Sequence, residues 1–220
     1  MKHARQFRVL GSGWISSSGH GRSGTVPRFA RGEAELQYPD LLAYIPELPP
    51  RYGRFDTYTN ACFSAAILAL YDADLLQRER KHIGIVVGSS SGVYDNDLVY
   101  YASTQEADGA FTSPNLFTYT LPNVALGEIA VYARFTGPSF CVGNDPAHPG
   151  LEAARIARSL LVADRCEIVL TGWVEVAHRF PGHEQLPKGA AFAVLTRARS
   201  GDPHPESPGD ADPFARWLEA

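Results

Sequence analysis

The apolar run at residues 83–89 (IGIVVGS) is the feature that most constrains what this chain can fold into. It has the length of a strand, it is rich in β-branched residues, and no polar residue precedes its final serine. Such a segment cannot alternate buried and exposed positions, so the strand must be covered on both faces, as in a parallel sheet between helices. The run therefore predicts a layered α/β fold.

Segments typical of strands and helices alternate along the chain. Strands are predicted at residues 7–15, 83–89, 138–144, 166–177 and 189–198, and helices at 55–75, 93–104, 123–135 and 149–165. This order predicts a mixed, mostly parallel five-stranded sheet with helices on both faces and an antiparallel pair at its end. Residues 19–54 are rich in Gly, Pro, Arg and Tyr, and we expect a long irregular excursion there.

The length of 220 residues fits one domain, which we place at residues 1–198. Residues 199–220 are polar and rich in Pro, Gly and Asp, a composition that predicts a flexible tail. The N-terminus lacks the apolar core of a secretory signal, so we expect a cytoplasmic protein.

Composition excludes several kinds of partner and cofactor. The formal net charge is -4 and no basic stripe is present, which argues against nucleic acid. No stretch approaches about 18 uninterrupted apolar residues, so no membrane span is predicted. Three cysteines without CxxC spacing predict neither a disulfide framework nor a zinc site, and no cofactor or metal is expected.

The segment Gly88-Ser89-Ser90-Ser91-Gly92 follows the apolar strand and has the G-x-S-x-G pattern of a nucleophile elbow. Chain order allows a triad with Ser90, because two acids (Asp145, Asp164) are followed by two histidines (His178, His183). The same letters also describe a glycine-rich turn whose serines are simply small. A serine hydrolase or acyltransferase that uses Ser90 therefore stands as one hypothesis.

Several segments together resemble the N-terminal half of β-ketoacyl synthases, which have the thiolase fold. FRVLGSGWISSSG resembles the opening strand of that family, RYGRFDTYTNACFSAAILALYDADL its Arg-x-x-Arg-Phe helix, and HIGIVVGSSSG its second strand and glycine-rich loop. The most extensive similarity lies in SPNLFTYTLPNVALGEIAVYARFTGPSFCV, through Ser113-Pro114, Asn123 and Gly137-Pro138. CEIVLTGWVEVA resembles a strand that usually reads Ala-Gly-Gly-x-Glu, with Trp173 at the second glycine.

The resemblance implies a thiolase-like half without the catalytic residues. The family's nucleophilic cysteine stands at the position nine residues after Gly137, which is Pro146 here. A proline side chain cannot form a thioester. The two histidines and the lysine of the family belong to its C-terminal half, which we expect to lie beyond this chain. The implied function is a non-catalytic accessory or chain-length-factor-like subunit in type II fatty-acid or polyketide (aryl-polyene-like) biosynthesis.

The resemblance also implies partners. Residues 61–70 are apolar on every side and the helix at 123–135 is rich in small residues, so we expect both to be covered by another protein. The predicted assembly is a homodimer, or a heterodimer with a full-length ketosynthase, with an acyl carrier protein as a further partner. In the family the loop after Ser-Pro crosses the dimer interface, which makes Leu116 and Phe117 candidates for contact with an acyl chain. Ordinary interface or core packing is the alternative for these two residues, and a stand-alone acyl-binding or structural protein of the same fold is the third hypothesis.

Overall fold

The computed structural model describes residues 7–23, 29, 34–76, 79, 81–106, 110, 112–177 and 188–198. The tail predicted at residues 199–220 lies outside the described residues, as do His178 and His183.

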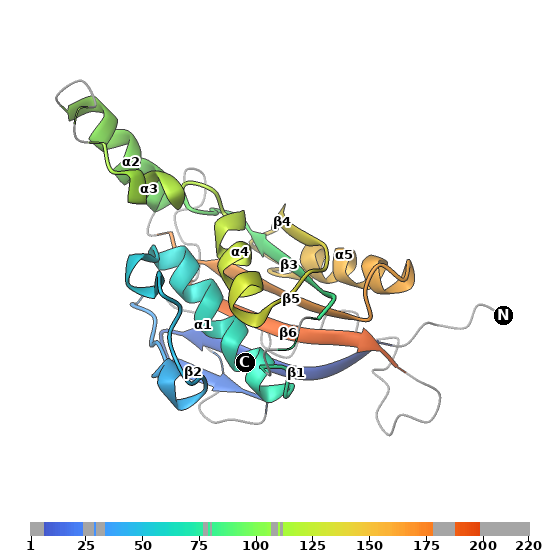
Figure 1. The fold of residues 1–220 in the computed structure, drawn as a ribbon. Helices are drawn as coiled ribbons and strands as arrows, with labels where there is room; N and C mark the ends of the chain where they lie inside the picture. Colours follow the sequence, from blue (N-terminus) through green and yellow to red (C-terminus); the bar gives the residue numbers. More distant parts are fainter. Residues whose placement is uncertain are drawn as a thin grey trace.

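One mixed sheet of six strands forms the centre of the molecule (Figure 1). The strands are β1 (Phe7–Ser16), β2 (Gly19–Arg22), β3 (Ile83–Ser89), β4 (Ser139–Gly143), β5 (Ile168–Glu175) and β6 (Gly189–Arg197). Their order across the sheet is β2-β1-β6-β5-β3-β4. The additional strand, β2, comes from the segment predicted to be irregular, and it pairs with the end of β1 as a hairpin.

The expected predominance of parallel pairing is wrong, and the position of β6 explains why. The pairs β3–β4 and β3–β5 are parallel, whereas β1–β2, β1–β6 and β5–β6 are antiparallel. Strands β1, β3, β4 and β5 all run in one direction, but β6 returns against them and is inserted between β1 and β5. Neighbour pairing depends on the order in space, which the alternation of helices and strands along the chain does not determine.

Helices cover both faces of the sheet, as predicted (Figure 1). α1 (Thr57–Asp72) and α4 (Asn123–Ala133) lie on one face, and α5 (Leu151–Val162) lies on the other. Side chains of successive residues in β3 point to opposite faces of the sheet, since Ile85 and Val87 pack toward α1 while Val86 packs toward α5. Beyond α5, the second face is closed by edge-to-face contacts of Phe29 with Trp14 and Trp173, each at 5.7 Å between ring centroids.

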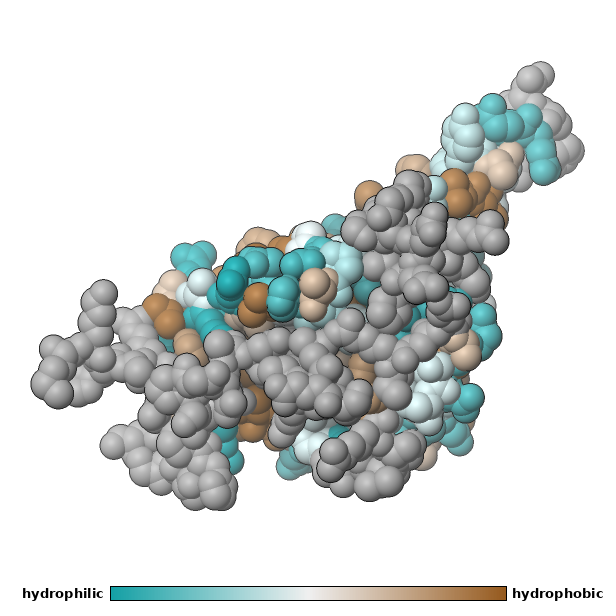
Figure 2. Space-filling view, turned by 180° about the vertical axis from the view of Figure 1, so that it is seen from behind, coloured by the Kyte–Doolittle hydropathy of each residue, from teal (hydrophilic) through white to brown (hydrophobic). Residues whose placement is uncertain are grey.

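α2 (Tyr94–Gln105) and α3 (Pro114–Thr118) form an arm that projects from this body (Figures 1 and 2). α2 contains no buried residue, and neither does α3. The sequence predicted a helix over most of α2 but none at α3, which begins where the Ser113 side chain accepts a hydrogen bond from Leu116 N. Two 3-10 turns, η1 (Leu41–Ala43) and η2 (Tyr52–Arg54), lie in the segment before α1.

Residues 61–70 of α1 are buried on every side by this chain alone, which corrects the expectation that a partner must cover them. All residues from Ala61 to Leu70 have 0% exposure. The helix packs on β1 and β6 and against α4, and the side chains of Tyr44, Tyr52 and Phe55 close its remaining side. α4 differs, because its inner residues are buried whereas Val131 on its outer side is 78% exposed.

The contact between α1 and β1 depends on two glycines. A Cβ atom at Gly13 would lie 2.3 Å from the Ala69 backbone nitrogen, and one at Gly11 would lie 2.5 Å from that of Ala73. Backbone atoms cannot give way as a flexible side chain can, so only glycine permits this separation of helix and strand. The Gly-x-Gly in the first strand is therefore a packing feature of the fold.

None of the helices in the described ranges combines the length and apolar character needed to cross a bilayer. Within the same ranges, no group of three or more His, Cys, Asp or Glu side chains is placed to hold a metal ion.

We predict that Gly13→Ala destabilises the protein by about 2–3 kcal/mol, because the added methyl group must push α1 away from β1. Gly53→Ala is the matched control, since a Cβ at Gly53 meets no atom within 4 Å. Urea unfolding should show the control within about 0.5 kcal/mol of the unaltered chain. Equal unfolding free energies for the two variants would show that the close approach of α1 to Gly13 does not contribute to stability.

Candidate functional site

Three parallel strands, β3, β4 and β5, end at the same edge of the sheet, where the loops that follow them meet. In α/β proteins this edge is the usual location of ligand and active sites. It contains the Gly-Ser-Ser-Ser-Gly turn after β3, the segment with Pro146 after β4, and Glu175 at the end of β5. The structure thus brings two of the sequence candidates, Ser90 and Pro146, to one place.

Glu175 is the centre of this edge and is only 3% exposed. Its carboxylate accepts hydrogen bonds from Ser91 Oγ (2.8 Å), from Ser91 N (3.2 Å) and, closely, from Ser90 N. No ion pair joins it to a Lys or Arg within the described part of the chain. A buried charge requires compensation, and here the amides and hydroxyls of the serine turn provide it.

Asn144 connects the three loops. Its Oδ1 accepts a hydrogen bond from Gly150 N at 2.8 Å, just before α5, and its Nδ2 donates to Glu175 Oε1 at 3.5 Å. Gly88 allows this approach, because a Cβ there would lie 3.2 Å from Asn144 Oδ1. The edge is consequently a network of hydrogen bonds internal to the fold.

Ser90 takes part in that network as a donor. Its hydroxyl donates to the backbone carbonyl of Asn144 at 2.9 Å. A nucleophilic serine instead gives its proton to a base, and no described residue stands as a base on this hydroxyl. Of the two acids considered for a triad, Asp145 is paired with His148 at 3.0 Å, and Asp164 is paired with Arg197 at the opposite edge of the sheet.

Pro146 lies in a turn that separates β4 from α5. Asp145 closes this turn, since its Oδ1 accepts from Ala147 N at 2.9 Å and its carbonyl accepts from His148 N at 2.9 Å. α5 begins only at Leu151, after Gly150 in a left-handed conformation (φ 83°). The position of Pro146 is therefore remote from the helix N-terminus, whose dipole lowers the pKa of a cysteine placed there.

The cysteine nearest to Pro146 in sequence, Cys141, lies within β4 and does not have the environment of a reactive thiol. Burial raises the pKa of its thiol to about 11, against an opposing hydrogen bond from Tyr58. Burial likewise raises the pKa of Cys62, which is completely enclosed in α1. A thiol with a raised pKa is protonated at neutral pH, and the thiolate is the reactive form.

The root of the arm borders a cavity of about 340 Å³. Leu116 lines this cavity from the arm, and Phe55, Tyr58 and Tyr119 line it from the body. Phe117 does not line it: the residue is 61% exposed, and its ring packs against that of Tyr100 at 5.5 Å between centroids. Leu116 and Phe117 are adjacent in sequence but face different surroundings, which the sequence did not reveal.

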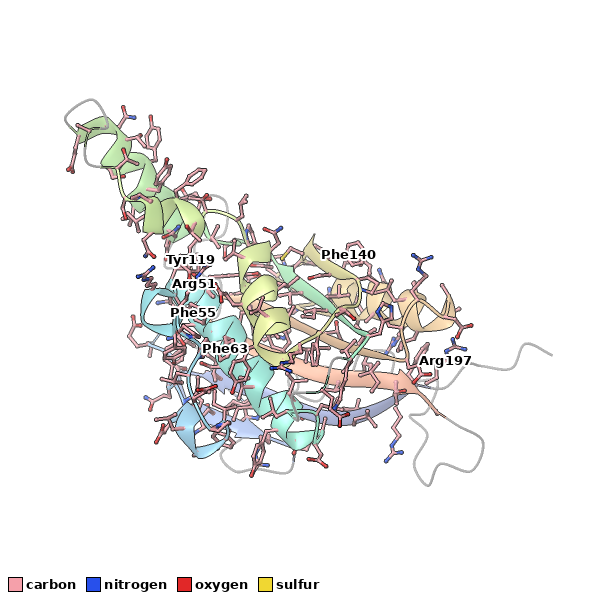
Figure 3. The ribbon with its side chains drawn as sticks, viewed as in Figure 1. Arg51, Phe55, Phe63, Tyr119, Phe140 and Arg197 are labelled. Atoms are coloured by element: carbon pink, nitrogen blue, oxygen red, sulfur yellow. The ribbon has the colours of Figure 1, made fainter. Side chains whose placement is uncertain are left out.

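A second depression of about 680 Å³ lies along the outer side of α4. Val124, Gly127 and Val131 line it from the helix, and Pro49 and Pro50 line it from the segment before α1. Arg51 stands at its rim, paired with Glu128 at 3.8 Å, and Figure 3 shows Arg51 next to Phe55 and Tyr119 at the arm root.

Sequence reasoning missed the two residues that organise the edge of the sheet. Glu175 carries a detectable signal, because it is a single acid at the end of an otherwise uncharged strand, IVLTGWV. An acid in such a position is buried and needs several donors. Asn144 carries no such signal, since its role comes from the meeting of three loops distant in sequence.

Comparison with known proteins agrees with the resemblance seen in the sequence. The family model described as β-ketoacyl synthase, N-terminal domain, matches residues 28–204. No curated protein sequence matches the chain.

Similar solved structures come from ketosynthase systems. The ishigamide ketosynthase/chain length factor has a TM-score of 0.69 at 17% identity, over 91% of this chain and 64% of that one. A type II polyketide synthase acyl carrier protein in complex with its ketosynthase bound to the hexaketide (AntDE:AntF) has a TM-score of 0.63 at 19% identity, over 88% and 63%. A complex of the ketosynthase ApeO with its chain length factor ApeC from Xenorhabdus doucetiae has a TM-score of 0.64 at 17% identity, over 98% and 92%.

These likenesses confirm the expected thiolase-like α/β fold. The chain spans less than two thirds of the length of the first two of these proteins, and nearly the whole length of the matched chain of the third.

We predict that Glu175→Gln destabilises the protein by about 2 kcal/mol. The amide NH₂ group that replaces one carboxylate oxygen is a donor, and it would face N–H and O–H groups that donate to that oxygen in the unaltered protein. Glu167→Gln, which changes an exposed residue just before β5, is the control and should alter the unfolding free energy by less than about 0.5 kcal/mol. Urea unfolding monitored by tryptophan fluorescence measures both. If the two variants unfold alike, the network around Glu175 does not hold the loops.

Proposed function

This chain belongs to the β-ketoacyl synthase N-terminal domain family, and we propose that it is a non-catalytic member that pairs with an active ketosynthase as a chain-length-factor-like subunit. The observation that carries the proposal is the turn at Pro146. The position that would hold the nucleophile has no thiol and lies five residues before the first residue of α5. The turn that contains it is closed by hydrogen bonds to Asp145.

Two features of the comparisons support a pairing subunit. Two of the similar structures are described as containing a chain length factor, one of them in complex with its ketosynthase. In that complex the matched chain is covered almost completely by this one, so the two chains are similar in length. The setting we propose is type II fatty-acid or polyketide biosynthesis of the aryl-polyene kind, in the cytoplasm, with an acyl carrier protein delivering the chain.

The arm provides the contacts in this proposal. Phe117 faces outward at 61% exposure and is positioned to meet the ketosynthase. Leu116 lines the cavity at the arm root, where it can limit the space open to the end of an acyl chain. The two residues thus take separate parts, one in assembly and one in chain length.

Co-expression with a ketosynthase from the same genome should yield a stable complex of one copy of each chain, as measured by size-exclusion chromatography with light scattering. We expect Phe117→Ala to weaken this complex about tenfold, the usual effect of removing an exposed aromatic anchor. Leu116→Ala should leave the complex intact and lengthen the product measured by mass spectrometry, because it enlarges the cavity.

Leu42→Ala is the control for both variants, since Leu42 is 58% exposed but lies on η1 in the body. No complex, together with a product that is unchanged when this chain is omitted, would overturn the accessory role. That result would favour a stand-alone acyl-binding or structural protein.

Pro146→Cys should not restore covalent catalysis. The new thiol would stand in a turn, without the helix N-terminus that lowers the pKa of a nucleophilic cysteine. Intact-mass spectrometry after incubation with acylated carrier protein is expected to show acylation of the ketosynthase alone. An acyl adduct on the substituted residue would contradict the proposal, and Ser90-dependent labelling by a fluorophosphonate would instead favour the hydrolase hypothesis.

A further inference from the structure

The polar tail contains one apolar cluster that the proposed function does not use. Phe214, Trp217 and Leu218 stand in the segment FARWLEA, with the spacing i, i+3 and i+4. This spacing puts three large apolar side chains on one face of a helical turn. The segment lies outside the described residues, and side chains of this kind favour burial against a surface.

An acidic linker precedes this cluster. Residues 202–212 contain four Asp or Glu and no Lys or Arg. The 15 residues 199–213 separate Ala198, where the described chain stops, from Phe214. At about 3.3 Å per residue, such a linker reaches roughly 50 Å at most. Reach therefore leaves much of the surface open to the cluster, and charge must select the site.

The described chain stops at a basic edge of the sheet. β6 ends on the side of the molecule away from the arm, where β3 and β5 begin (Figure 1). The basic residues at this edge are Arg134, Lys81, His82 and Arg165. They are held in a row, because Lys81 N donates to the Arg134 carbonyl at 3.2 Å and His82 Nε2 lies 2.9 Å from the Arg165 carbonyl oxygen.

Basic side chains are in excess at this edge. Asp164 and Glu167 line the same depression, of about 640 Å³, but Asp164 is already paired with Arg197. No ion pair joins Lys81 or Arg165 to an acid within the described ranges. An acidic linker that starts at the end of β6 is therefore attracted along this edge.

The basic edge leads into an apolar groove. This α4 groove is the depression of about 680 Å³ between the outer side of α4 and Pro49 and Pro50. Arg134 belongs to both places, since it lines the groove and is the C-terminal cap of α4. Within the groove, Val131 is 78% exposed, so its apolar surface is largely uncovered.

Gly127 gives the α4 groove room for a large side chain. A Cβ at this position would meet no atom within 4 Å, so packing within the chain does not require a glycine. A glycine inside a helix lowers the stability of that helix relative to alanine. The ring of Trp217 is large enough to use the space that the missing side chain leaves.

We propose that residues 214–220 dock in the α4 groove of their own chain, and that the acidic residues of 202–212 lie along the basic edge. The apolar cluster supplies the buried area, and the charges set the path of the linker. Docking covers part of the apolar surface that α4 presents before the chain meets any partner. The inference does not depend on the accessory function.

Tethering decides between the chain's own segment and that of a second copy. A short linker holds the segment near its own groove at an effective concentration on the order of 1 mM, which a second copy does not match in dilute solution. The arm is a less favourable site, because residues 94–118 contain no Lys, Arg or His to attract the acidic linker.

Tryptophan fluorescence of the full chain tests the docking. Of the three tryptophans, Trp14 and Trp173 are only 3% and 1% exposed, so quenching by acrylamide reports chiefly on Trp217. We expect Val131→Gln to raise the quenching constant about threefold, because quenching is weighted by the fraction of undocked molecules. Val99→Gln, the same change at a 56% exposed valine of α2, is the matched control and should not raise it.

A second pair of variants tests the path of the linker. Raising NaCl from roughly 50 mM to 500 mM should increase quenching about twofold, since salt screens exposed charges. Arg134→Gln with Arg165→Gln should have the same effect at low salt. Arg54→Gln with Arg155→Gln removes two exposed arginines elsewhere and should change nothing.

Each outcome decides one part of the proposal. Full quenching of Trp217 in the unaltered chain overturns the docking, and protection that Val131→Gln does not reduce shows that the segment lies elsewhere. Protection that grows with protein concentration assigns the groove to a second copy and overturns docking within the chain. Quenching that ignores both salt and the loss of Arg134 and Arg165 overturns the path along the basic edge. In a Trp217→Phe background the groove variant and its control should be quenched equally, which excludes a change in the fold.

Discussion

The backbone contact between α1 and β1 is the constraint on which the rest of the molecule depends. Gly11 and Gly13 let the helix lie directly on the strand, and every residue from Ala61 to Leu70 is buried as a result. This contact holds the C-terminal half of α1 on the strand, whereas the Asp56 side chain caps its N-terminus. Asp56, the cap of that helix, and Tyr58 in its first turn both line the cavity at the arm root. α1 therefore extends from the central packing to the root of the arm.

The edge of the sheet that usually carries a ligand is occupied here by the protein's own carboxylate. Ser90 N and Ser91 N point at Glu175, in the way that the amides of a glycine-rich turn receive an anion. The Gly-Ser-Ser-Ser-Gly turn thus resembles a catalytic loop in sequence while it serves as the donor set for a buried acid. The closed turn at Pro146 and the buried thiol of Cys141 complete an edge that is organised for rigidity.

The exposed large apolar side chains do not all lie on one surface, since Leu42 on η1 and Tyr71 near the end of α1 are also exposed. Exposed apolar side chains occur on the arm and on the outer side of α4, whereas the exposed side of α5 carries the charged pair Glu152 and Arg155 at 2.5 Å. Phe140 on the edge strand β4 is also 44% exposed, but it pairs with Val86 and therefore lies on the face of the sheet that α5 covers. The largest group of these side chains, on the arm and the outer side of α4, is the kind of surface that an assembly interface requires.

Local patterns determined the elements of this protein, and they determined the family. The apolar run at 83–89 specified a doubly covered strand, and the segment that ends in Gly137-Pro138 indicated the family, because these signals depend on neighbours in sequence. The insertion of β6 between β1 and β5, the burial of α1 by its own chain, the role of Glu175, and the different surroundings of Leu116 and Phe117 arose only from the tertiary structure. Each of them depends on which distant segments meet, and the free energy of burying an apolar or charged group is set by those segments and not by the residue alone.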